Sequence, residues 1–515
     1  MHQLFYLRHG RCLRVLQNYK KLFTLANLSK QEFIDAIVHE FGLTPTHDQL
    51  HALKTFANFL ADRSDNCVMI LRGSAGTGKT SLASAMVKTF LRMGQKLSLL
   101  APTGRAAKVF SVNSGQPAGT IHRKIYRERQ YVGLEGEFNL AENKHKNTLF
   151  MVDEASMIGT HSSGSFGFGS GDLLADLIAY VYQGDHCRLL LIGDGAQLPP
   201  IGENDAPALQ CDVLEGKGLK VYECSLKEVL RQSQDSGILY NATQIRALLP
   251  SDDDAAAPFT LNTFPRIHFQ GFADVVRLSG ADFIETLSES YYKVGEEETM
   301  VVTRSNKRAN LFNKGIRGQV LEYEEELSSG DLLMVVKNKY LAVPAGDNGE
   351  FSFIANGDRA KVLRVRNVHE CHGFLFADVW LQFPDYNQLE LQQRVILDTL
   401  TAESPALSHE QQERLYESVM ADYADIPRKR DRIEKLKADP YFNALQIKYA
   451  YAVTCHKAQG GQWAHVYVDQ GYVTEEMLTP DYIHWLYTAF TRATEKLFLV
   501  NWPKQQMADG ADDDD

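Results

Sequence analysis

The stretch Gly73-Ser-Ala-Gly-Thr-Gly-Lys79-Thr80 decides the fold of this chain. It follows a short apolar run, residues 67–71, and opens a segment of helical pattern. The glycines allow backbone N–H groups to surround a phosphate, and a helix N-terminus adds partial positive charge. Lys79 is placed to reach the β- and γ-phosphates of a nucleotide, and the Thr80 hydroxyl to bind Mg²⁺. A glycine-rich turn of chance composition is the alternative, but the flanking strand and helix favour a phosphate loop.

Short apolar runs and helical segments alternate on the C-terminal side of this loop, which predicts a parallel sheet of the α/β class. The further runs lie at 97–100, 149–152 and 188–192. The rhythm ends near Pro250, where Ser-Asp-Asp-Asp-Ala-Ala-Ala-Pro predicts a linker. A glycine- and serine-rich run at 159–171 predicts a surface loop.

A second α/β unit follows the linker. It is predicted from a strand at Thr299–Thr303 and a helix at Asn306–Gln319. From residue 327 to about 385 the pattern changes to short β segments separated by glycine and asparagine turns, which predicts a small barrel. A polar helical stretch at 402–440 precedes the return of α/β character. The simplest organisation is an insertion within the second α/β domain.

Length and composition bound the class of protein. A chain of 515 residues predicts several domains, and 44% apolar with 23% charged residues is typical of a soluble globular protein. No apolar run is long enough for a membrane span, and basic residues near the N-terminus argue against a signal peptide. The seven cysteines are scattered, so neither a zinc site nor a disulfide framework is expected, and a reducing cytoplasm fits.

The net charge of −11 conceals an uneven distribution. Residues 101–129 hold six Lys or Arg against one acid, and residues 301–320 hold five and no acid. Two basic tracks on an acidic body are compatible with a groove that binds phosphates. Taken alone, each track is better explained as a solvated helix face.

A nucleotide hydrolase also needs an acidic site. The segment Leu149-Phe-Met-Val-Asp153-Glu154 supplies two carboxylates at the end of an apolar strand, where ligands of parallel sheets bind. Asp153 is expected to hold Mg²⁺ through water, and Glu154 to polarise the attacking water. Gln197, after another apolar strand, is placed to sense the γ-phosphate. Arg231 and Arg492 lie far apart in sequence, and by pattern alone both would be ordinary surface arginines.

In order along the chain, these segments resemble the motifs of superfamily 1 helicases, in detail the RecD/Dda branch, which moves 5′ to 3′. Thr46-His-Asp-Gln49 resembles its adenine-reading motif, and Gly119-Thr-Ile-His122 its motif Ib. Segments 101–108, 226–232, 452–460 and 486–493 resemble motifs Ia, IV, V and VI. The match covers roughly residues 44–503. Longer relatives carry a large N-terminal domain, whereas fewer than 50 residues precede Gln49, so a plan closer to compact Dda is expected.

The resemblance implies two RecA-like motor domains. The first is expected at 44–255, and the second at 256–326 and 444–503. An SH3-like barrel with a helical segment would be inserted at 327–443. A partly helical extension would occupy 1–43 and an acidic tail 504–515.

The resemblance also implies the residues of each site, with ATP and Mg²⁺ as cofactors. Catalysis would use Lys79, Glu154, Gln197, Arg231 and Arg492, with the two arginines acting across the cleft between the domains. Nucleotide contacts would come from Gln49, Gly73, Ser74, Ala75, Gly76, Thr77, Gly78, Lys79, Thr80 and Gly460, and metal contacts from Thr80 and Asp153. DNA contacts would come from Pro102, Thr103, Lys108, Thr120, His122, Asn306, Thr454 and His456.

A β-hairpin is predicted within residues 125–147, because Tyr131 and Phe138 flank Gly133 and Gly136. Relatives carry a strand-separating pin at this point in the chain. A surface hairpin that covers the first domain is the alternative.

The expected function is an ATP-dependent DNA helicase acting on single-stranded and forked DNA, without nuclease activity. Proteins of replication, repair or recombination, and single-strand-binding proteins, are the partner classes implied. A single-strand translocase or remodeller, an RNA helicase and a nucleotide-switched DNA-binding module are the alternatives.

Overall fold

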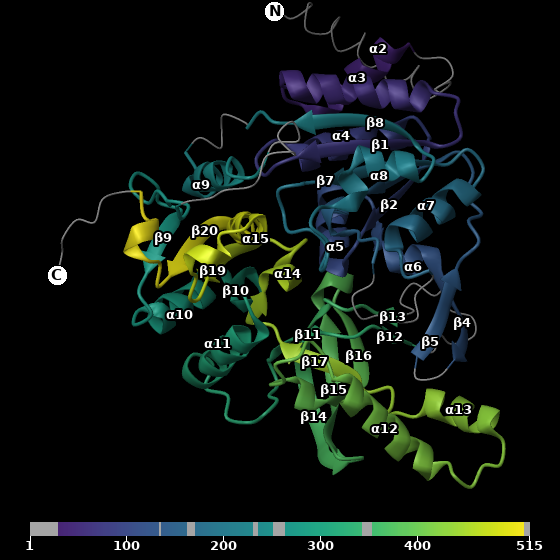
Figure 1. Ribbon diagram of the computed structural model, residues 1–515, viewed down its shortest axis with the longest axis vertical. Helices are drawn as coiled ribbons and strands as arrows, with labels where there is room; N and C mark the ends of the chain where they lie inside the picture. The colour runs from purple at the N-terminus through teal and green to yellow at the C-terminus, as the bar shows by residue number, and fades with distance from the viewer. Residues whose placement is uncertain are drawn as a thin grey trace, which may run out of the picture.

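The computed structural model describes residues 29–132, 135–161, 170–229, 235–250, 263–341 and 353–508. The expected linker at 251–258 lies outside these ranges, as do most of the N-terminal extension and the end of the acidic tail. Two parallel sheets, a closed barrel and two two-stranded pairs make up the β structure of the described residues, which confirms the predicted fold class (Figure 1).

The first sheet has six parallel strands in the order β3-β2-β6-β7-β1-β8. Its strands are β1 (Cys67–Gly73), β2 (Lys96–Ala101), β3 (Ala118–Thr120), β6 (Thr148–Val152), β7 (Arg188–Gly193) and β8 (Lys220–Leu226). Alternate side chains of each strand enter different cores: Met69 and Leu71 join one cluster, and Val68 and Ile70 another. Because both faces are covered, the central strands β1, β6 and β7 are almost wholly apolar, as strands of parallel sheets usually are.

Helices cover both faces of this sheet. One core is formed with α2 (Lys30–Phe41), α3 (His47–Ala61), α4 (Lys79–Arg92) and α5 (Gly104–Ser114). The other is formed with α6 (Ile121–Ile125), α7 (Leu173–Gln183) and α8 (Cys211–Gly216).

The second sheet has five parallel strands in the order β18-β10-β19-β20-β9. They are β9 (Val275–Leu278), β10 (Thr299–Thr303), β18 (Ala452–Thr454), β19 (Trp463–Asp469) and β20 (Ala493–Val500). Its helices are α9 (Gly237–Arg246), α10 (Phe283–Val294), α11 (Asn306–Gln319), α14 (Cys455–Ala458) and α15 (Pro480–Phe490). The bounds of β10 and α11 are those that the sequence predicts.

Helix α9 lies on the second sheet, not on the first. Its buried side chains Ile238, Ala242 and Ile245 share one apolar cluster with β10, β19 and β20. Although α9 falls within the range 44–255 expected for the first motor domain, it therefore packs with the second motor domain in space. Arg246, the last residue of α9, is positioned by the second domain as a result.

The inserted unit is a closed barrel of β11, β14, β15, β16 and β17. The strands are β11 (Leu332–Val335), β14 (Arg359–Cys371), β15 (Phe374–Phe383), β16 (Leu389–Ile396) and β17 (Leu445–Tyr449), and a separate pair is β12 (Lys339–Tyr340) with β13 (Phe353–Ile354). The helices α12 (His409–Asp422) and α13 (Lys429–Ala438) separate β16 from β17. Since β17 closes the barrel, the expected return to the second motor domain at residue 444 falls too early.

The predicted hairpin is present as the antiparallel pair β4 (Tyr126–Val132) and β5 (Glu135–Leu140). It projects from the first domain beside α6 (Figure 1). At its base, Tyr126 pairs with Leu140 and donates a 2.7 Å hydrogen bond to Asp176. The side chains of Tyr131 and Phe138 lie outside the described part of the structure.

Among the residues that the structure describes, no helix has the length and apolar character needed to cross a bilayer.

Candidate active site

The phosphate loop connects β1 to α4, as the sequence predicts. Gly76 and Gly78 have φ angles of 77° and 79°, a left-handed conformation that glycine adopts without strain. A Cβ on Gly73 would lie 2.8 Å from Cγ of Lys79, so the loop also needs a glycine where it folds back on the lysine. The loop therefore presents its backbone N–H groups at the start of α4, where an anion is favoured.

Lys79 lies along its own loop. Its ammonium group donates to the Gly73 carbonyl and, at 3.1 Å, to the Ser74 carbonyl. The same nitrogen lies 3.9 Å from Oδ2 of Asp194, the residue that follows β7. These contacts mark the Gly73–Ser74 side as the end of the loop where the terminal phosphates of a nucleotide would lie.

Gln49 supports the loop from the opposite side. Its amide nitrogen donates to the Thr77 carbonyl at 3.0 Å, and its amide oxygen accepts from the backbone N–H of Thr46 at 3.0 Å. The second bond belongs to the capping box of α3. The amide nitrogen of this fully buried side chain thus connects α3 to the phosphate loop, while its oxygen closes the cap of α3. Its expected contact with adenine stays a prediction.

The two expected acidic residues follow β6 directly. Oδ1 of Asp153 accepts from the Glu154 backbone N–H at 2.9 Å, and Glu154 has a left-handed φ of 53°. Loss of water and the neighbouring Glu154 carboxylate raise the pKa of Asp153 to about 7, and Lys79 partly opposes this shift. An acidic pair held away from water fits a divalent cation, and carboxylate and hydroxyl oxygens are the ligands that Mg²⁺ prefers.

Gln197 lies in the segment after β7, which forms hydrogen bonds with the second domain. It is buried, and its Oε1 finds no hydrogen-bond partner among the described residues. An uncompensated buried oxygen of this kind is rare and fits a site for a ligand or water.

Bonds on both sides of Gln197 fix this segment to the second domain. The Ala196 carbonyl lies 2.9 Å from Nδ1 of His484, and the Leu198 N–H donates to Oγ1 of Thr488 at 2.7 Å. Nε2 of Gln459 donates to the Leu198 carbonyl at 2.5 Å. Displacement of α15 would therefore move Gln197.

Arg492 does not reach the phosphate loop in this structure. Its guanidinium is 2% exposed and donates to the carbonyls of Thr488 and Gly461, each at 3.0 Å, and to Oγ1 of Thr491 at 3.1 Å. It thus connects α15 to the loop after α14. The other expected cross-cleft arginine, Arg231, lies outside the described residues.

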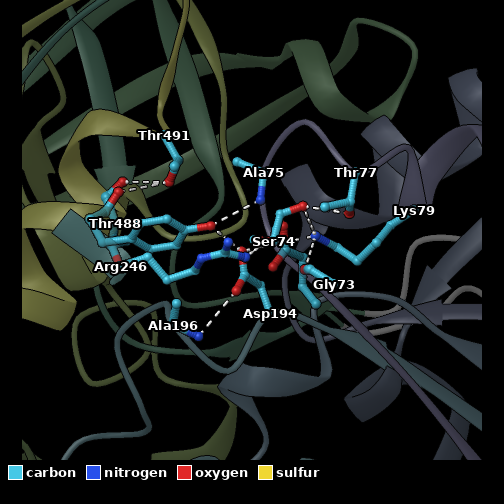
Figure 2. A network of polar contacts seen from close by, with 12 residues as sticks. Gly73, Ser74, Ala75, Thr77, Lys79, Asp194, Ala196, Arg246, Thr488 and Thr491 are labelled. Atoms are coloured by element: carbon cyan, nitrogen blue, oxygen red, sulfur yellow. Dashed lines mark hydrogen bonds and ion pairs between the residues drawn. The ribbon is translucent and has the colours of Figure 1, made fainter. Parts of the chain in front are cut away.

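Two other residues of the second domain do reach the phosphate loop. Nη1 of Arg246 donates to the Ser74 hydroxyl, and the Ala75 N–H donates to the Tyr487 hydroxyl at 2.9 Å. Figure 2 shows Arg246 pointing at the loop, with Asp194 beside it. Neither residue is marked by a local sequence pattern, although Tyr487 lies within the segment that resembles motif VI.

Gly460 lies away from the phosphate loop. A Cβ on Gly460 would lie 3.1 Å from Cβ of Ala106 and 3.2 Å from Oγ1 of Thr103. The structure therefore places it against the start of α5, which gives no support to the expected nucleotide contact. Its position instead brings a loop of the second domain beside an expected DNA-binding threonine of the first.

Expected DNA-binding residues of both domains lie at helix N-termini. Thr103 caps α5, Thr120 caps α6, and Thr454 precedes α14. Asn306 is the first residue of α11, which Ser305 caps. Hydroxyls and free N–H groups at such positions suit phosphate oxygens.

Burial lowers the pKa of both expected histidines. The pKa of His122 falls to about 4, and the pKa of His456, on α14, is also lowered. A neutral His122 suits hydrogen bonding or stacking, not ion pairing. Pro102 lies directly between β2 and the Thr103 cap.

The barrel covers part of this DNA face, which the sequence did not predict. Lys108 donates to the Pro384 carbonyl at 2.8 Å and lies 3.3 Å from Asp385. The Tyr386 ring lies 4.4 Å from the Arg123 guanidinium, and its hydroxyl donates to Asp358 at 2.7 Å. Burial raises the pKa of Asp358 to about 6. Lys108 is thus engaged by the barrel in this structure.

Two family models match the chain. The AAA domain matches residues 45–256, and the UvrD-like helicase C-terminal domain matches residues 449–500. The ATP-dependent RecD2 DNA helicase of Deinococcus radiodurans is 25% identical, over 86% of this chain and 48% of that protein. The ATP-dependent DNA helicase dda of Enterobacteria phage T4 is 24% identical, over 52% of this chain and 55% of that protein.

The chain is thus similar to helicases of the RecD and Dda kind, and it carries matches to an AAA domain and to a UvrD-like helicase C-terminal domain. It also matches the uncharacterized protein MJ1519 of Methanocaldococcus jannaschii, with 23% identity over 84% of this chain and 36% of that protein. The chain spans about half or less of the length of these curated relatives. Among solved structures, a Bacteroides Pif1 helicase in complex with ADP-AlF3 and ssDNA aligns over 90% of this chain and 94% of that one, with 13% identity and a TM-score of 0.46.

Proposed function

We propose that this chain is an ATP-driven DNA helicase that moves 5′ to 3′ along a single strand and unwinds duplex ahead of it. One observation carries the proposal: both motor domains meet at the phosphate loop, where Tyr487 of the second accepts a hydrogen bond from Ala75 of the first. A nucleotide between two domains can change their separation when it binds and when it is hydrolysed. Such a change is what a motor needs.

Each part of the site has an assigned role in hydrolysis. Lys79 neutralises the β- and γ-phosphates, and Glu154 orients the attacking water and accepts its proton. Thr80 and Asp153 would hold Mg²⁺, which supplies neutralising charge to the phosphate oxygens when bound. Gln197 contacts the γ-phosphate, directly or through water, and transmits its presence to α15 through the neighbouring bonds to His484 and Thr488.

Arg231 and Arg492 complete the site by stabilising the charge that develops on the γ-phosphate oxygens. For Arg492, this role requires that it exchange the carbonyls of Thr488 and Gly461 for phosphate when the cleft closes.

The DNA path crosses both domains over the helix N-termini described above. Support comes from a loop of the second domain that lies beside an expected DNA residue of the first, since a Cβ on Gly460 would lie 3.2 Å from Oγ1 of Thr103. Binding through hydroxyls and N–H groups ignores base sequence, as a translocating enzyme requires. The hairpin of β4 and β5 then acts as the wedge that separates the strands.

Two alternative functions can be distinguished from this proposal by experiment. A single-strand translocase would hydrolyse ATP on single strands without separating duplex, and an RNA helicase would respond to RNA as substrate. The test is the steady-state ATPase rate without nucleic acid, with single-stranded DNA and with single-stranded RNA of equal length. We expect strong stimulation by DNA and weaker stimulation by RNA. A rate that neither polymer changes would overturn the proposal.

A further inference from the structure

Arg246 is held rigidly by the second motor domain. Helix α9 begins at a cap in which Asp274 accepts hydrogen bonds from the Gly237 N–H at 2.9 Å and from the Ser236 hydroxyl at 2.7 Å. The apolar face of α9 is buried against α15 and β20. Arg246 is the last residue of this anchored helix, so the position of its guanidinium follows the position of the whole domain.

The guanidinium lies at the terminal-phosphate end of the loop. Arg246 donates to the Ser74 hydroxyl, and the Lys79 ammonium lies on the carbonyls of Gly73 and the same Ser74 (Figure 2). Two cations, one from each domain, thus converge on one short segment. Their partners here are neutral loop oxygens and the Asp194 carboxylate, which lies 3.9 Å from Nζ of Lys79.

Protein groups also occupy the hydrogen-bonding positions that a phosphate would use. The Tyr487 hydroxyl accepts from the Ala75 N–H at 2.9 Å and donates to Oδ2 of Asp194 at 2.6 Å. A γ-phosphate has the oxygens to accept from the Ala75 N–H, from Lys79 and from a guanidinium at once. A guanidinium is also better matched to phosphate than to a single hydroxyl, because its N–H groups form a planar fork.

We propose that Arg246 binds the γ-phosphate of ATP and is a further residue through which the second domain distinguishes ATP from ADP. This inference rests on the proposed nucleotide site, and it concerns a different arginine from Arg231 and Arg492. When ATP binds, Arg246 leaves Ser74 for the γ-phosphate oxygens, so a contact of α9 with the loop is replaced by a contact with the nucleotide. With ADP there is no γ-phosphate, and Arg246 returns to the Ser74 hydroxyl.

The test compares nucleotide affinities of the full chain, wild type and Arg246→Ala, for ADP and for a non-hydrolysable ATP analogue in Mg²⁺. We expect Arg246→Ala to weaken binding of the analogue by about tenfold or more, equal to about 1.4 kcal/mol, while ADP affinity stays within about twofold. Arg246→Lys should restore part of the discrimination, since an ammonium keeps the charge and loses the fork. Arg277→Ala, an exposed arginine of β9, is the matched control and should change neither affinity.

The outcomes separate the two claims. Equal weakening of ADP and analogue, or no weakening of either, would overturn the role of Arg246 and leave it as a domain-interface contact. Wild-type protein that binds neither nucleotide would overturn the proposed function itself. Thermal unfolding of each variant identifies a loss of affinity that comes from misfolding, and Arg246→Lys then carries the test.

Discussion

Lys79 makes all its described polar contacts with the phosphate loop and Asp194, so its replacement should leave the fold intact. We expect Lys79→Ala to abolish ATP hydrolysis, because the β- and γ-phosphates lose their cationic partner. Binding to single-stranded DNA without nucleotide should persist, since the DNA residues lie elsewhere. Lys88→Ala, an exposed lysine on the same helix, is the control for a steady-state ATPase assay. ATP hydrolysis by Lys79→Ala at the wild-type rate would refute the proposal that this loop drives an ATP-dependent motor.

Arg492 donates several buried hydrogen bonds within the second domain, and it also has an expected catalytic role. We predict that Arg492→Ala reduces DNA-stimulated turnover by ~10³–10⁵-fold, as loss of an arginine finger does. It should also lower the Tm, because the buried Thr488 and Gly461 carbonyls lose their donor, at a cost of about 1–3 kcal/mol each. A variant that unfolds earlier yet turns over within a few-fold of wild type would restrict Arg492 to the structural role.

Some contacts at the active site can be predicted from the sequence, and others cannot. The loop around Lys79 is local, so strand, glycines and helix within a few residues identify it. Tyr487 and Arg246 reach the same loop from 412 and 172 residues away, and no local pattern specifies such a pairing. Tyr487 at least lies in a segment that resembles a helicase motif, whereas Arg246 follows from the fold alone.

At the scale of elements, the hairpin of β4 and β5 is the part whose removal should stop duplex unwinding but leave translocation along a single strand intact. Replacement of residues 128–138 by a short Gly/Ser turn keeps the Tyr126–Leu140 base and its bond to Asp176. We expect loss of duplex unwinding with retention of DNA-stimulated ATPase, because stacking at the fork, worth ~1–3 kcal/mol per base, is lost. The measurement is strand displacement beside ATPase on the same forked DNA. Unwinding at the wild-type rate would show that the hairpin only covers the surface of the first domain and does not separate the strands.

Element bounds were predicted well where the hydrophobic period is unambiguous, as for β10 and α11. The sequence does not predict how an element packs when its hydrophobic period is clear but the sheet that it joins is not. Helix α9 has an apolar face, yet nothing in its pattern says which sheet that face meets. Strand β17 is buried along its whole length, as a strand of a parallel sheet would be, but it closes the barrel.

At the scale of the whole molecule, the barrel connects to both the DNA face and the second sheet. Its contacts with α5 and α6 run through Asp358, Asp385 and Tyr386, all in turns between strands. Turn residues are polar and exposed by pattern, so sequence gives no sign that they meet a basic surface. The two basic tracks were visible in the sequence, but the acidic groups that cover one of them were not.

The central claim is ATP-driven unwinding with 5′-to-3′ polarity, and strand displacement on tailed duplexes tests it most directly. Three substrates are compared with ATP and with a non-hydrolysable analogue: a duplex with a 5′ single-stranded tail, one with a 3′ tail and one with blunt ends. The predicted result is ATP-dependent unwinding of the 5′-tailed duplex alone, falling steeply with added salt because binding is mainly to phosphates. Unwinding that prefers the 3′ tail, or that proceeds equally with the analogue, would contradict the account.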